Sequence, residues 1–240
     1  MTALFISDLH LSAQRPAAVE LFLRFARDRV AHASTLYILG DLFDAWIGDD
    51  DESALAVAVR EALRALTSAG VTVYFQAGNR DFLVGERFAA ATGVVLLPEA
   101  AVAEVSGVPA LLMHGDLLCT DDLDYQQARR LLRSPAFIDD FLAKPFATRA
   151  TIAAEYRRRS GEATSLKAED IMDVNAGAVI EAMRAHGVRR LIHGHTHRPA
   201  RHAFTLDGAP AERIVLAEWH DDEGQCLRAD GQGVLIETVY

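Results

Sequence analysis

The stretch Phe5-Ile6-Ser7-Asp8-Leu9-His10 indicates the fold, because an apolar run typical of a buried strand ends at an acid and a histidine. Side chains alternate along an extended segment, so Asp8 and His10 lie on the same side of it. Their carboxylate and imidazole groups could therefore converge on one cation. The stretch alone is weak evidence, since a single histidine at a strand end is more often a hydrogen-bonded structural residue.

Four further segments repeat this arrangement of an apolar run followed by potential ligands. They are Gly40-Asp41-Leu42-Phe43-Asp44, Gly78-Asn79-Arg80-Asp81, His114-Gly115-Asp116 and Gly194-His195-Thr196-His197. Strands that end in Asp, Asn and His gather oxygen and imidazole ligands at one edge of a sheet. We therefore predict a pair of divalent cations that acts on a phosphate ester.

The predicted metal ligands are the carboxylate, amide and imidazole side chains of these segments: Asp8, His10, Asp41, Asn79, His114, His195 and His197. Asp41 is the expected bridging ligand, because its tight Gly-Asp turn projects the carboxylate off the strand end. Asp8, His10 and His197 could complete the shell of one ion, and Asn79, His114 and His195 that of the other. A ligand set without a thiolate favours Mn²⁺, two ions per chain, over Fe²⁺, Co²⁺ or Zn²⁺. Asp44, Asp81 and Asp116 are expected to orient histidines or amides.

Length, charge and cysteine content limit the class of protein. The chain has 240 residues, 50% of them hydrophobic, and a formal charge of −10. This suits one large α/β domain or one domain with an insertion, and it argues against general nucleic-acid binding. Cys119 and Cys226 are far apart and indicate reduced thiols. We find no leader and no apolar run near the ~20 residues that span a bilayer, so we expect a cytoplasmic protein, soluble or peripheral to a membrane.

Strand and helix patterns alternate in the first part of the chain, which predicts a mixed sheet or sandwich flanked by helices. We expect strands at residues 3–7, 36–39, 71–76 and 190–192, and helices at about 16–32, 53–68 and 174–186, with Ser53 as an N-cap. Ser106-Gly107 predicts a hairpin between strands 101–105 and 108–113. From residue 200, short apolar runs and turn pairs predict hairpins that cover the sheet.

The region from 121 to 170 differs from the rest, because its pattern is helical without a strand signal. Residues 126–167 contain nine basic and four acidic residues in a chain that is acidic overall. We predict a core of residues 1–120 and 171–240 with a helical lid insertion at 121–170 over an anionic substrate. An ordinary solvated helical hairpin is an equal alternative. The apolar residues Phe137, Ile138, Phe141, Leu142 and Phe146 could line an acyl-chain groove or form a plain helical core.

Taken together, the five segments resemble the calcineurin-like metallophosphoesterase superfamily. The resemblance implies an α/β double β-sandwich flanked by helices, with a dinuclear metal centre. Many relatives carry a histidine where this chain has Arg80. An arginine cannot give up a proton at neutral pH, but its planar fork binds phosphate oxygens well. This difference suits a leaving group that is already a phosphate, with a second pKa of about 6, and predicts a pyrophosphate ester as the substrate.

A closer resemblance is to the UDP-2,3-diacylglucosamine pyrophosphatases of lipid A biosynthesis. It rests on Gly78-Asn79-Arg80-Asp81, on the opening segment through Leu11, and on the helical region after Asp116. It implies attack of water at the α-phosphorus, giving UMP and 2,3-diacylglucosamine 1-phosphate, by a monomer that contacts the cytoplasmic face of the inner membrane. The positions implied for substrate binding are Asn79, Arg80, Asp122, Ser160, Thr164, Lys167 and His195. Those implied for catalysis are Asp41, Asn79, Arg80, His114 and His195.

Two other functions remain open from the sequence. The chain could be a metallophosphoesterase that acts on another nucleotide or on a phosphoprotein. It could also be a non-catalytic scaffold on the same fold, although scaffolds of this kind usually lose ligands and every expected ligand position is filled here.

Overall fold

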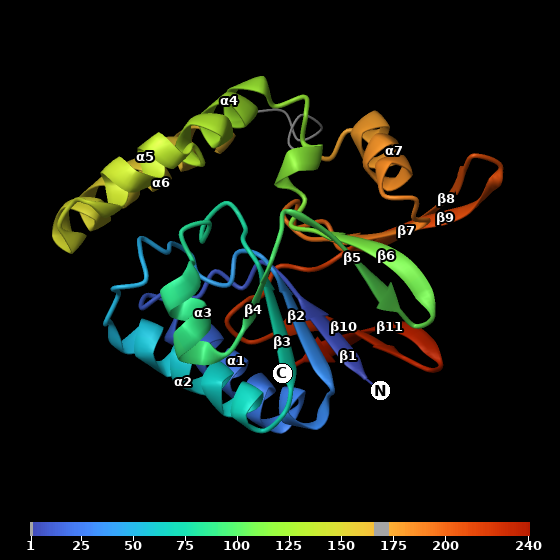
Figure 1. Ribbon diagram of the computed structural model, residues 1–240, viewed down its shortest axis with the longest axis horizontal. Helices are drawn as coiled ribbons and strands as arrows, with labels where there is room; N and C mark the ends of the chain where they lie inside the picture. Colours follow the sequence, from blue (N-terminus) through green and yellow to red (C-terminus); the bar gives the residue numbers. More distant parts are fainter. Residues whose placement is uncertain (1, 166–172) are drawn as a thin grey trace.

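Parallel strands separated by helices build the first of two β-sheets (Figure 1). The computed structural model describes residues 2–165 and 173–240, with side chains of the first range described to residue 158. β1 (Ala3–Ile6), β2 (Thr35–Leu39), β3 (Thr72–Gln76) and β4 (Val95–Leu97) run parallel. β10 (Gly224–Asp230) pairs antiparallel with β1, and β11 (Gly233–Val239) pairs with β10. The strand order is therefore β11-β10-β1-β2-β3-β4.

The second sheet has the order β5-β6-β7-β9-β8. Its strands are β5 (Ala100–Val105), β6 (Val108–Met113), β7 (Arg190–His193), β8 (Ala200–Leu206) and β9 (Ala209–Val215). The central strands β6, β7 and β9 run parallel, and each edge is a hairpin. Both residues of the turns Ser106-Gly107 and Asp207-Gly208 have positive φ, as two-residue hairpin turns of the favoured twist require.

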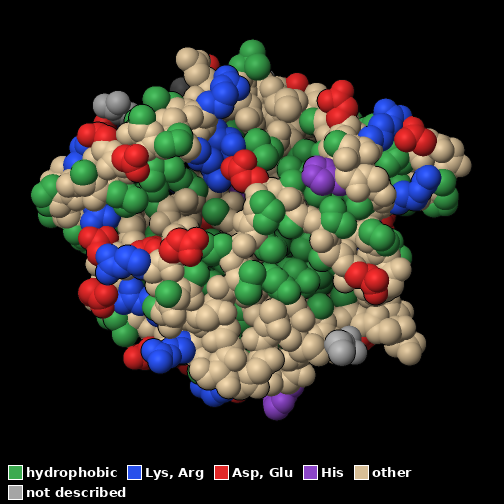
Figure 2. Space-filling view, in the orientation of Figure 1, with side chains coloured by type: hydrophobic (Ala, Val, Ile, Leu, Met, Phe, Trp, Pro, Cys, Tyr) green, Lys and Arg blue, Asp and Glu red, His purple; other side chains and the backbone are tan. Residues whose placement is uncertain are grey.

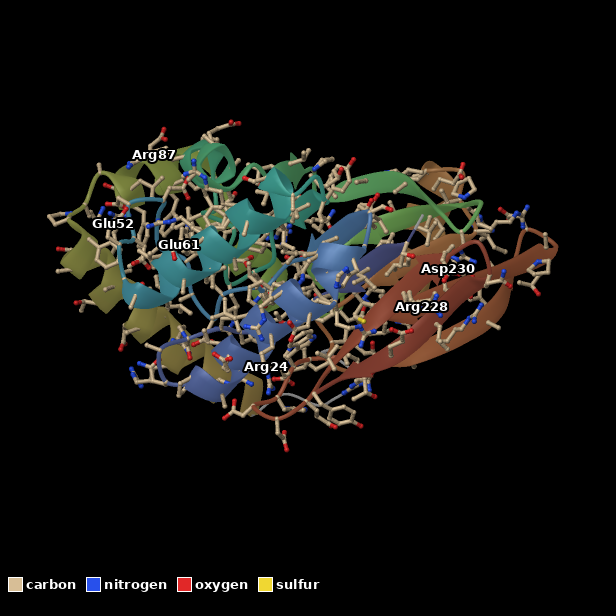
Figure 3. The ribbon with its side chains drawn as sticks, turned by 90° about the horizontal axis from the view of Figure 1, so that it is seen from below. Arg24, Glu52, Glu61, Arg87, Arg228 and Asp230 are labelled. Carbon is tan, nitrogen blue, oxygen red and sulfur yellow. The ribbon has the colours of Figure 1, made fainter. Side chains whose placement is uncertain are left out.

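Helices cover the outer faces of both sheets. α1 (Pro16–Asp28), the short helix Val30–His32, α2 (Ala54–Ser68) and α3 (Glu86–Thr92) lie on the first sheet, and α7 (Ala176–Ala185) lies on the second (Figure 1). Figure 3 shows the charged Arg24 and Glu61 side chains on the outer surfaces of α1 and α2. Phe5, Leu39, Leu112 and Ile192 are among the fully buried side chains that join the two sheets. The predicted α/β double β-sandwich flanked by helices is confirmed.

In the described part of the chain between β6 and α7, three α-helices lie across the carboxyl ends of the strands (Figure 1). They are α4 (Leu123–Leu132), α5 (Pro135–Leu142) and α6 (Phe146–Ser165), after a short helical turn at Asp116–Leu118. Arg149 fastens α6 to the core: it is only 3% exposed, donates to the Ile47 carbonyl and pairs with Asp50. In the described part of the predicted insertion we find helices and no strand, and none of the described helices is long and apolar enough to cross a membrane.

The remaining sequence-based expectations concern single elements. The expected N-cap at Ser53 is confirmed, because its side chain accepts from the Ala56 amide at 3.3 Å. The short elements α3 and β4 were not predicted. The expectation that the C-terminal hairpins cover the sheet was wrong. The β8–β9 and β10–β11 hairpins instead extend the sheet edges, because β9 pairs with β7 and β10 pairs with β1.

The packing of Trp219 against Gly224 yields a testable consequence for stability. The Trp219 ring is fully buried, and a Cβ at Gly224 would lie 2.3 Å from it. We expect Gly224→Ala to lower the free energy of unfolding by about 1–3 kcal/mol through overpacking. Gly231→Ala is the matched control, since nothing lies within 4 Å of its Cβ position. Urea unfolding measures both, and equal midpoints would contradict this packing.

Candidate metal centre

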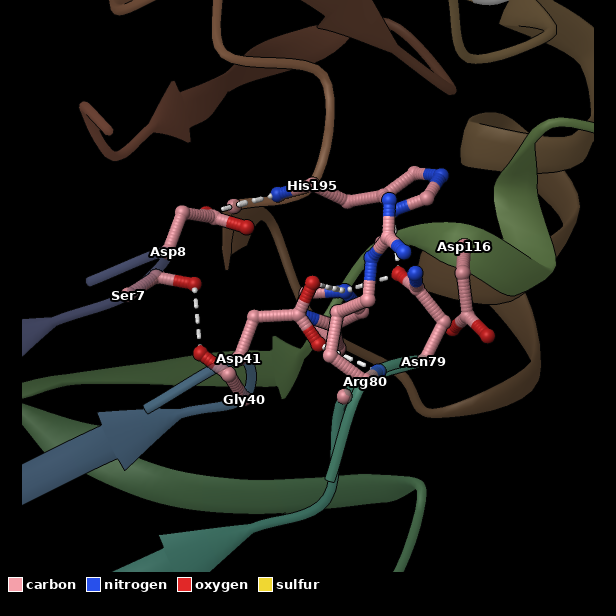
Figure 4. Close-up of polar contacts among 12 residues, drawn as sticks. Ser7, Asp8, Gly40, Asp41, Asn79, Arg80, Asp116 and His195 are labelled. Atoms are coloured by element: carbon pink, nitrogen blue, oxygen red, sulfur yellow. Dashed lines mark hydrogen bonds and ion pairs between the residues drawn. The ribbon is translucent and has the colours of Figure 1, made fainter. Parts of the chain in front are cut away.

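The predicted ligands lie together at one end of the sandwich (Figure 4). Asp8, Asp41 and Asn79 follow the parallel strands β1, β2 and β3, which end at the same edge of the first sheet. His114 follows β6, and His195 and His197 follow β7 of the second sheet. The site therefore lies where the ends of the two sheets meet, as expected for groups at the carboxyl ends of strands.

The backbone of this site is held in an unfavourable conformation. Five of the seven predicted ligands have φ between 49° and 68°, in the left-handed region: Asp8, His10, Asp41, His195 and His197. Non-glycine residues rarely adopt it, at a cost of about 1–3 kcal/mol each. The other two non-glycine residues with positive φ among those described, Ser106 and Asp207, are in hairpin turns. The strain is thus concentrated in the candidate site.

Asp81 holds two of these loops in position. Its buried carboxylate accepts from the backbone amides of Gly78 at 2.8 Å, Asp41 at 3.2 Å and Leu42 at 2.8 Å. Asp81 was expected to orient histidines or amides, and the groups that it binds are backbone amides. A single side chain therefore fixes the loops that follow β2 and β3 relative to each other.

Two glycines permit the close approach of the loops. A Cβ at Gly78 would lie 2.1 Å from Asp41 Oδ1, and a Cβ at Gly194 would lie 2.1 Å from Asp8 Oδ2. Contacts this short are not possible for a side chain. The glycines of the sequence motifs are needed because the carboxylates occupy the space of a side chain.

One cluster of potential ligands contains Asp8, His10 and His197, whose ligand atoms lie within 4.8 Å of one another. Asp8 Oδ1 is 3.4 Å from His197 Nε2, and the two Nε2 atoms of His10 and His197 are 3.3 Å apart. Asp8 is fully buried, and its Oδ1 atom has no hydrogen-bond partner among the described residues. A buried carboxylate oxygen facing two imidazole nitrogens suits a bound cation.

A second cluster contains Asp8, Asp41 and His114. Asn79 Oδ1 is 2.9 Å from both His114 Nε2 and His195 Nδ1, which brings both residues to this cluster. The other nitrogen of His114, Nδ1, lies 2.9 Å from the Leu39 carbonyl and donates to it, so the lone pair is on Nε2. In that tautomer Nε2 and the Asn79 oxygen are both acceptors, and only a cation or an additional proton can join them.

Asp41 faces both clusters. Its Oδ2 atom lies 3.7 Å from His114 Nε2 and 4.0 Å from His10 Nδ1. Its Oδ1 atom accepts from the Arg80 backbone amide at 2.8 Å, which fixes the carboxylate plane. This placement fits a ligand shared by two ions, although Asp8 also belongs to both clusters.

The pKa shifts of the site residues fit a site that binds cations. Burial raises the pKa of Asp41 to about 6. Burial lowers the pKa of His10 to about 4 and that of His195 to about 3, so both rings are neutral, as metal ligation requires. Burial would also lower the pKa of His197, but the nearby carboxylates of Asp8 and Glu218 raise it to about 10.

Glu218 is a residue of this site that sequence reasoning missed. It lies 2.9 Å from His197 Nδ1 and thereby directs Nε2 toward Asp8 and His10. A histidine that binds a metal through one ring nitrogen commonly donates the N–H of the other ring nitrogen to a carboxylate. Glu218 follows β9, far from the other segments and without a spacing signal, so no pattern in the chain could identify it.

The helical region contacts the site through two further acids. Asp116 accepts from the Tyr125 hydroxyl at 3.0 Å and from Arg129 Nε at 2.6 Å, both on α4. Asp44 pairs with Arg157 on α6. Asp44 and Asp116 were expected to orient histidines or amides, and this was wrong for the described contacts, because each carboxylate instead binds a basic side chain of these helices.

The other residues expected to bind the substrate belong to the helical region. Asp122 caps α4, where its carboxylate accepts from the Tyr125 amide at 3.0 Å, and the Tyr125 ring centroid lies 5.8 Å from that of His195. Ser160 and Thr164 belong to α6, but their side chains are outside the described part. Lys167 lies outside the described residues.

Two cavities adjoin the metal centre. The inner cavity, about 200 Å³, lies between the core and α4–α6 and has mostly apolar walls, including Trp46, Phe82, Leu83, Phe141 and Ile152. The outer cavity, about 810 Å³, opens on the side of His10 and His197. The site can therefore accept a molecule whose two ends differ in polarity.

Comparison with known proteins shows which family the chain resembles. The model of the calcineurin-like phosphoesterase family matches residues 1–199. Curated relatives called UDP-2,3-diacylglucosamine hydrolase include those of Cellvibrio japonicus (50% identity, 99% of each chain), Serratia proteamaculans (52%, 100% of each) and Pseudomonas aeruginosa PAO1 (48%, 97% of each). Among solved structures, a phosphoesterase from E. coli is 18% identical, with a TM-score of 0.45 over 96% of this chain and 88% of that chain.

The contact between Glu218 and His197 can be tested by metal binding. Glu218→Gln should weaken binding of one of two divalent cations about 10–100-fold, because His197 loses the carboxylate that orients it. Isothermal titration with Mn²⁺ measures the two affinities separately. Glu223→Gln, an exposed acid in the same segment, is the matched control. Two unchanged affinities in Glu218→Gln would show that His197 is positioned by other contacts.

Proposed function

The chain belongs to the UDP-2,3-diacylglucosamine hydrolase family of calcineurin-like phosphoesterases, and from this premise we propose its reaction in detail. Water attacks the α-phosphorus of UDP-2,3-diacylglucosamine, the pyrophosphate bond breaks, and UMP and 2,3-diacylglucosamine 1-phosphate are released for lipid A biosynthesis. The observation that carries the proposal is identity of about half of all residues with these hydrolases over essentially the full length of both chains.

The metal centre is proposed to hold two Mn²⁺ ions. Asp8, His10 and His197 would bind one ion, Asn79, His114 and His195 the other, and Asp41 would bind both. Oxygen and imidazole ligands without a thiolate suit Mn²⁺. When bound, a pair of such ions clamps the phosphoryl group and activates the attacking water. Both clusters share Asp8, whose buried Oδ1 atom has no hydrogen-bond partner among the described residues, and this supports the assignment.

Arg80 is proposed to stabilise the negative charge that develops on the phosphate oxygens. Its side chain lines both cavities and therefore lies where the two phosphates of the substrate would be. Its guanidinium can bind phosphate oxygens through two parallel hydrogen bonds. No acid is needed to protonate the leaving oxygen, since the sugar phosphate leaves as an anion that is stable at neutral pH.

The inner cavity is proposed to receive the diacylglucosamine half of the substrate. Its apolar walls would bury the acyl chains, and each buried CH₂ contributes about 0.8 kcal/mol. Asp122, Ser160, Thr164 and Lys167, together with Asn79, Arg80 and His195, are proposed to bind the sugar phosphate. This proposal carries the family resemblance onto α4 and α6, whose described side chains form one wall of the cavity.

We also propose that residues 121–170 form a lid that contacts the inner membrane from the cytoplasmic side. Figure 2 shows hydrophobic side chains interspersed with basic and acidic side chains over this part of the molecule. Leu123, Leu131, Leu142 and Tyr156 are exposed large hydrophobic residues there. Apolar and basic side chains together favour reversible docking on an anionic lipid surface. We expect a monomer, since this docking requires one copy of the lid.

Hydrolysis in ¹⁸O-labelled water tests the reaction. With the lipid-linked UDP-sugar and Mn²⁺, we expect the label in UMP, because water attacks the phosphorus that stays with the nucleoside. Asp41→Ala should retain no more than a few per cent of the parent rate. Mass spectrometry of the products locates the label. Label in the lipid phosphate, or faster turnover of a generic aryl phosphodiester without UMP release, would refute the proposed reaction.

The role of Arg80 can be tested by substitution. Arg80→Ala should lower kcat about 10²–10³-fold, as loss of a charge-stabilising group at a transition state does. The backbone bond from the Arg80 amide to Asp41 is retained in this variant. Arg87→Ala, an exposed arginine on α3, is the control. Steady-state kinetics provide the measurement, and an unchanged kcat would make Arg80 a structural residue.

A further inference from the structure

The outer cavity lies beside His10 and His197, on one side of the candidate metal centre. Each of its lining side chains is polar: His10, Ser12, Gln14, Arg15, Asp44, Arg80, Arg157, His197, Glu218, His220 and Asp221. Among the described residues, no aliphatic or aromatic hydrocarbon side chain lines this cavity. It suits a hydrophilic group with many hydrogen-bonding atoms instead.

The outer and inner cavities share three lining residues, Asp44, Arg80 and Arg157. Two of these are arginines, and Asp44 holds Arg157 in place through their ion pair. Arginine forks pair with phosphate oxygens, so a pyrophosphate fits at the junction of the cavities. A molecule with a pyrophosphate at this junction must extend one substituent into each cavity.

We propose that the outer cavity is the nucleoside subsite, which binds the ribose and uracil of the substrate and of the product UMP. The inference rests on the proposed function, because it takes the substrate to be a nucleoside diphosphate joined to a lipid. Of the two cavities beside the metal ligands, the inner one has the apolar walls that suit the apolar end of such a molecule. The nucleoside then lies beside His10 and His197, and the α-phosphorus lies over the metal ligands.

The side chains at the rim have unused hydrogen-bonding groups. Among the described residues, the side chains of Ser12, Gln14 and His220 have no hydrogen-bond partner. Uracil presents two carbonyl acceptors and one N–H donor along its edge, which the carboxamide of Gln14 can match with a donor and an acceptor. Glu218 and Asp221 have further carboxylate lone pairs that can accept from ribose hydroxyls.

Arg15 makes the wall of the outer cavity rigid. Its guanidinium donates to the carbonyls of Leu9 at 3.1 Å and Trp219 at 2.8 Å, and to Asp221 Oδ1 at 2.9 Å. These bonds join the loop after β1 to the segment that carries Glu218 and His220. The rim groups are therefore held before the ligand arrives, which reduces the ordering cost of binding.

The arrangement also accounts for the direction of bond cleavage. With the nucleoside in the outer cavity and the acyl chains in the inner one, the phosphorus over the metal ligands is the one that carries the nucleoside. The leaving sugar phosphate departs toward the inner cavity, past Arg80 and Asn79. Attack at the α-phosphorus thus follows from where the two ends of the substrate are held.

Equilibrium binding of UMP to the Mn²⁺-loaded protein tests the subsite. Gln14→Ala and His220→Ala should each raise the Kd for UMP at least tenfold. Inorganic phosphate, which lacks a nucleoside, should bind each variant as it binds the parent. Gln232→Ala and His32→Ala are matched controls, since both residues are exposed and lie at the opposite ends of the strands. Calorimetry provides the Kd values, and circular dichroism checks the fold.

The outcomes separate this inference from the proposed function. If UMP binds both rim variants as tightly as it binds the parent, the outer cavity does not bind the nucleoside and the inference is wrong. The inference is also wrong if Ile152→Ala, a change in the inner cavity, weakens UMP binding instead. If the parent protein releases no UMP from the lipid-linked substrate, the proposed function fails. The UMP titration remains readable in that case, since it requires no turnover.

Discussion

The interaction on which the site depends is the contact of the buried Asp8 carboxylate with the second sheet. Asp8 follows β1, and its Oδ2 atom accepts from the His195 amide at 2.8 Å, while the Asp8 carbonyl accepts from the Trp219 amide at 3.0 Å. One residue thus joins the first sheet, the loop after β7 and the segment that carries Glu218. Because Asp8 also belongs to both ligand clusters, the packing of the sandwich and the geometry of the metal centre are set by the same contact.

This dependence explains why the site combines strained backbone with buried charge. The left-handed conformations at Asp8, Asp41 and His195 aim side chains that ordinary strand ends would direct elsewhere. Backbone bonds between the loops, such as that from the Asp8 amide to the Gly40 carbonyl at 3.1 Å, keep those conformations in place. Buried carboxylates without a counter-charge are unfavourable, so such a cluster gains stability when cations bind. The strained backbone and the buried carboxylates destabilise the folded state, and bound cations would offset part of this destabilisation.

The sequence predicts those parts of the site that local patterns encode. Asp8, Asp41, Asn79 and His114 each come soon after an apolar run, so the strand ends bring them to one edge of the sandwich. The left-handed backbone that aims Asp8 and Asp41 was not part of that pattern. Glu218 and the contacts of Asp116 with α4 depend instead on how distant segments pack, and no period or spacing encodes them. The short elements α3 and β4 likewise contain too few residues for a pattern. Ser53 was identified because an N-cap is a local signal.

The distribution of charge links the site to its substrate. The chain is acidic overall, yet the region that crosses the strand ends is basic, and Arg129, Arg133 and Arg157 line the inner cavity below it. Asp116 and Asp44 bind Arg129 and Arg157 and hold these cations over the metal centre. An anionic headgroup is therefore attracted to the junction of the two cavities, while the acidic remainder of the surface repels it. Arg80 lies at that junction, and in the proposed reaction its fixed positive charge would stabilise an anionic leaving group, where an acid would have nothing to protonate.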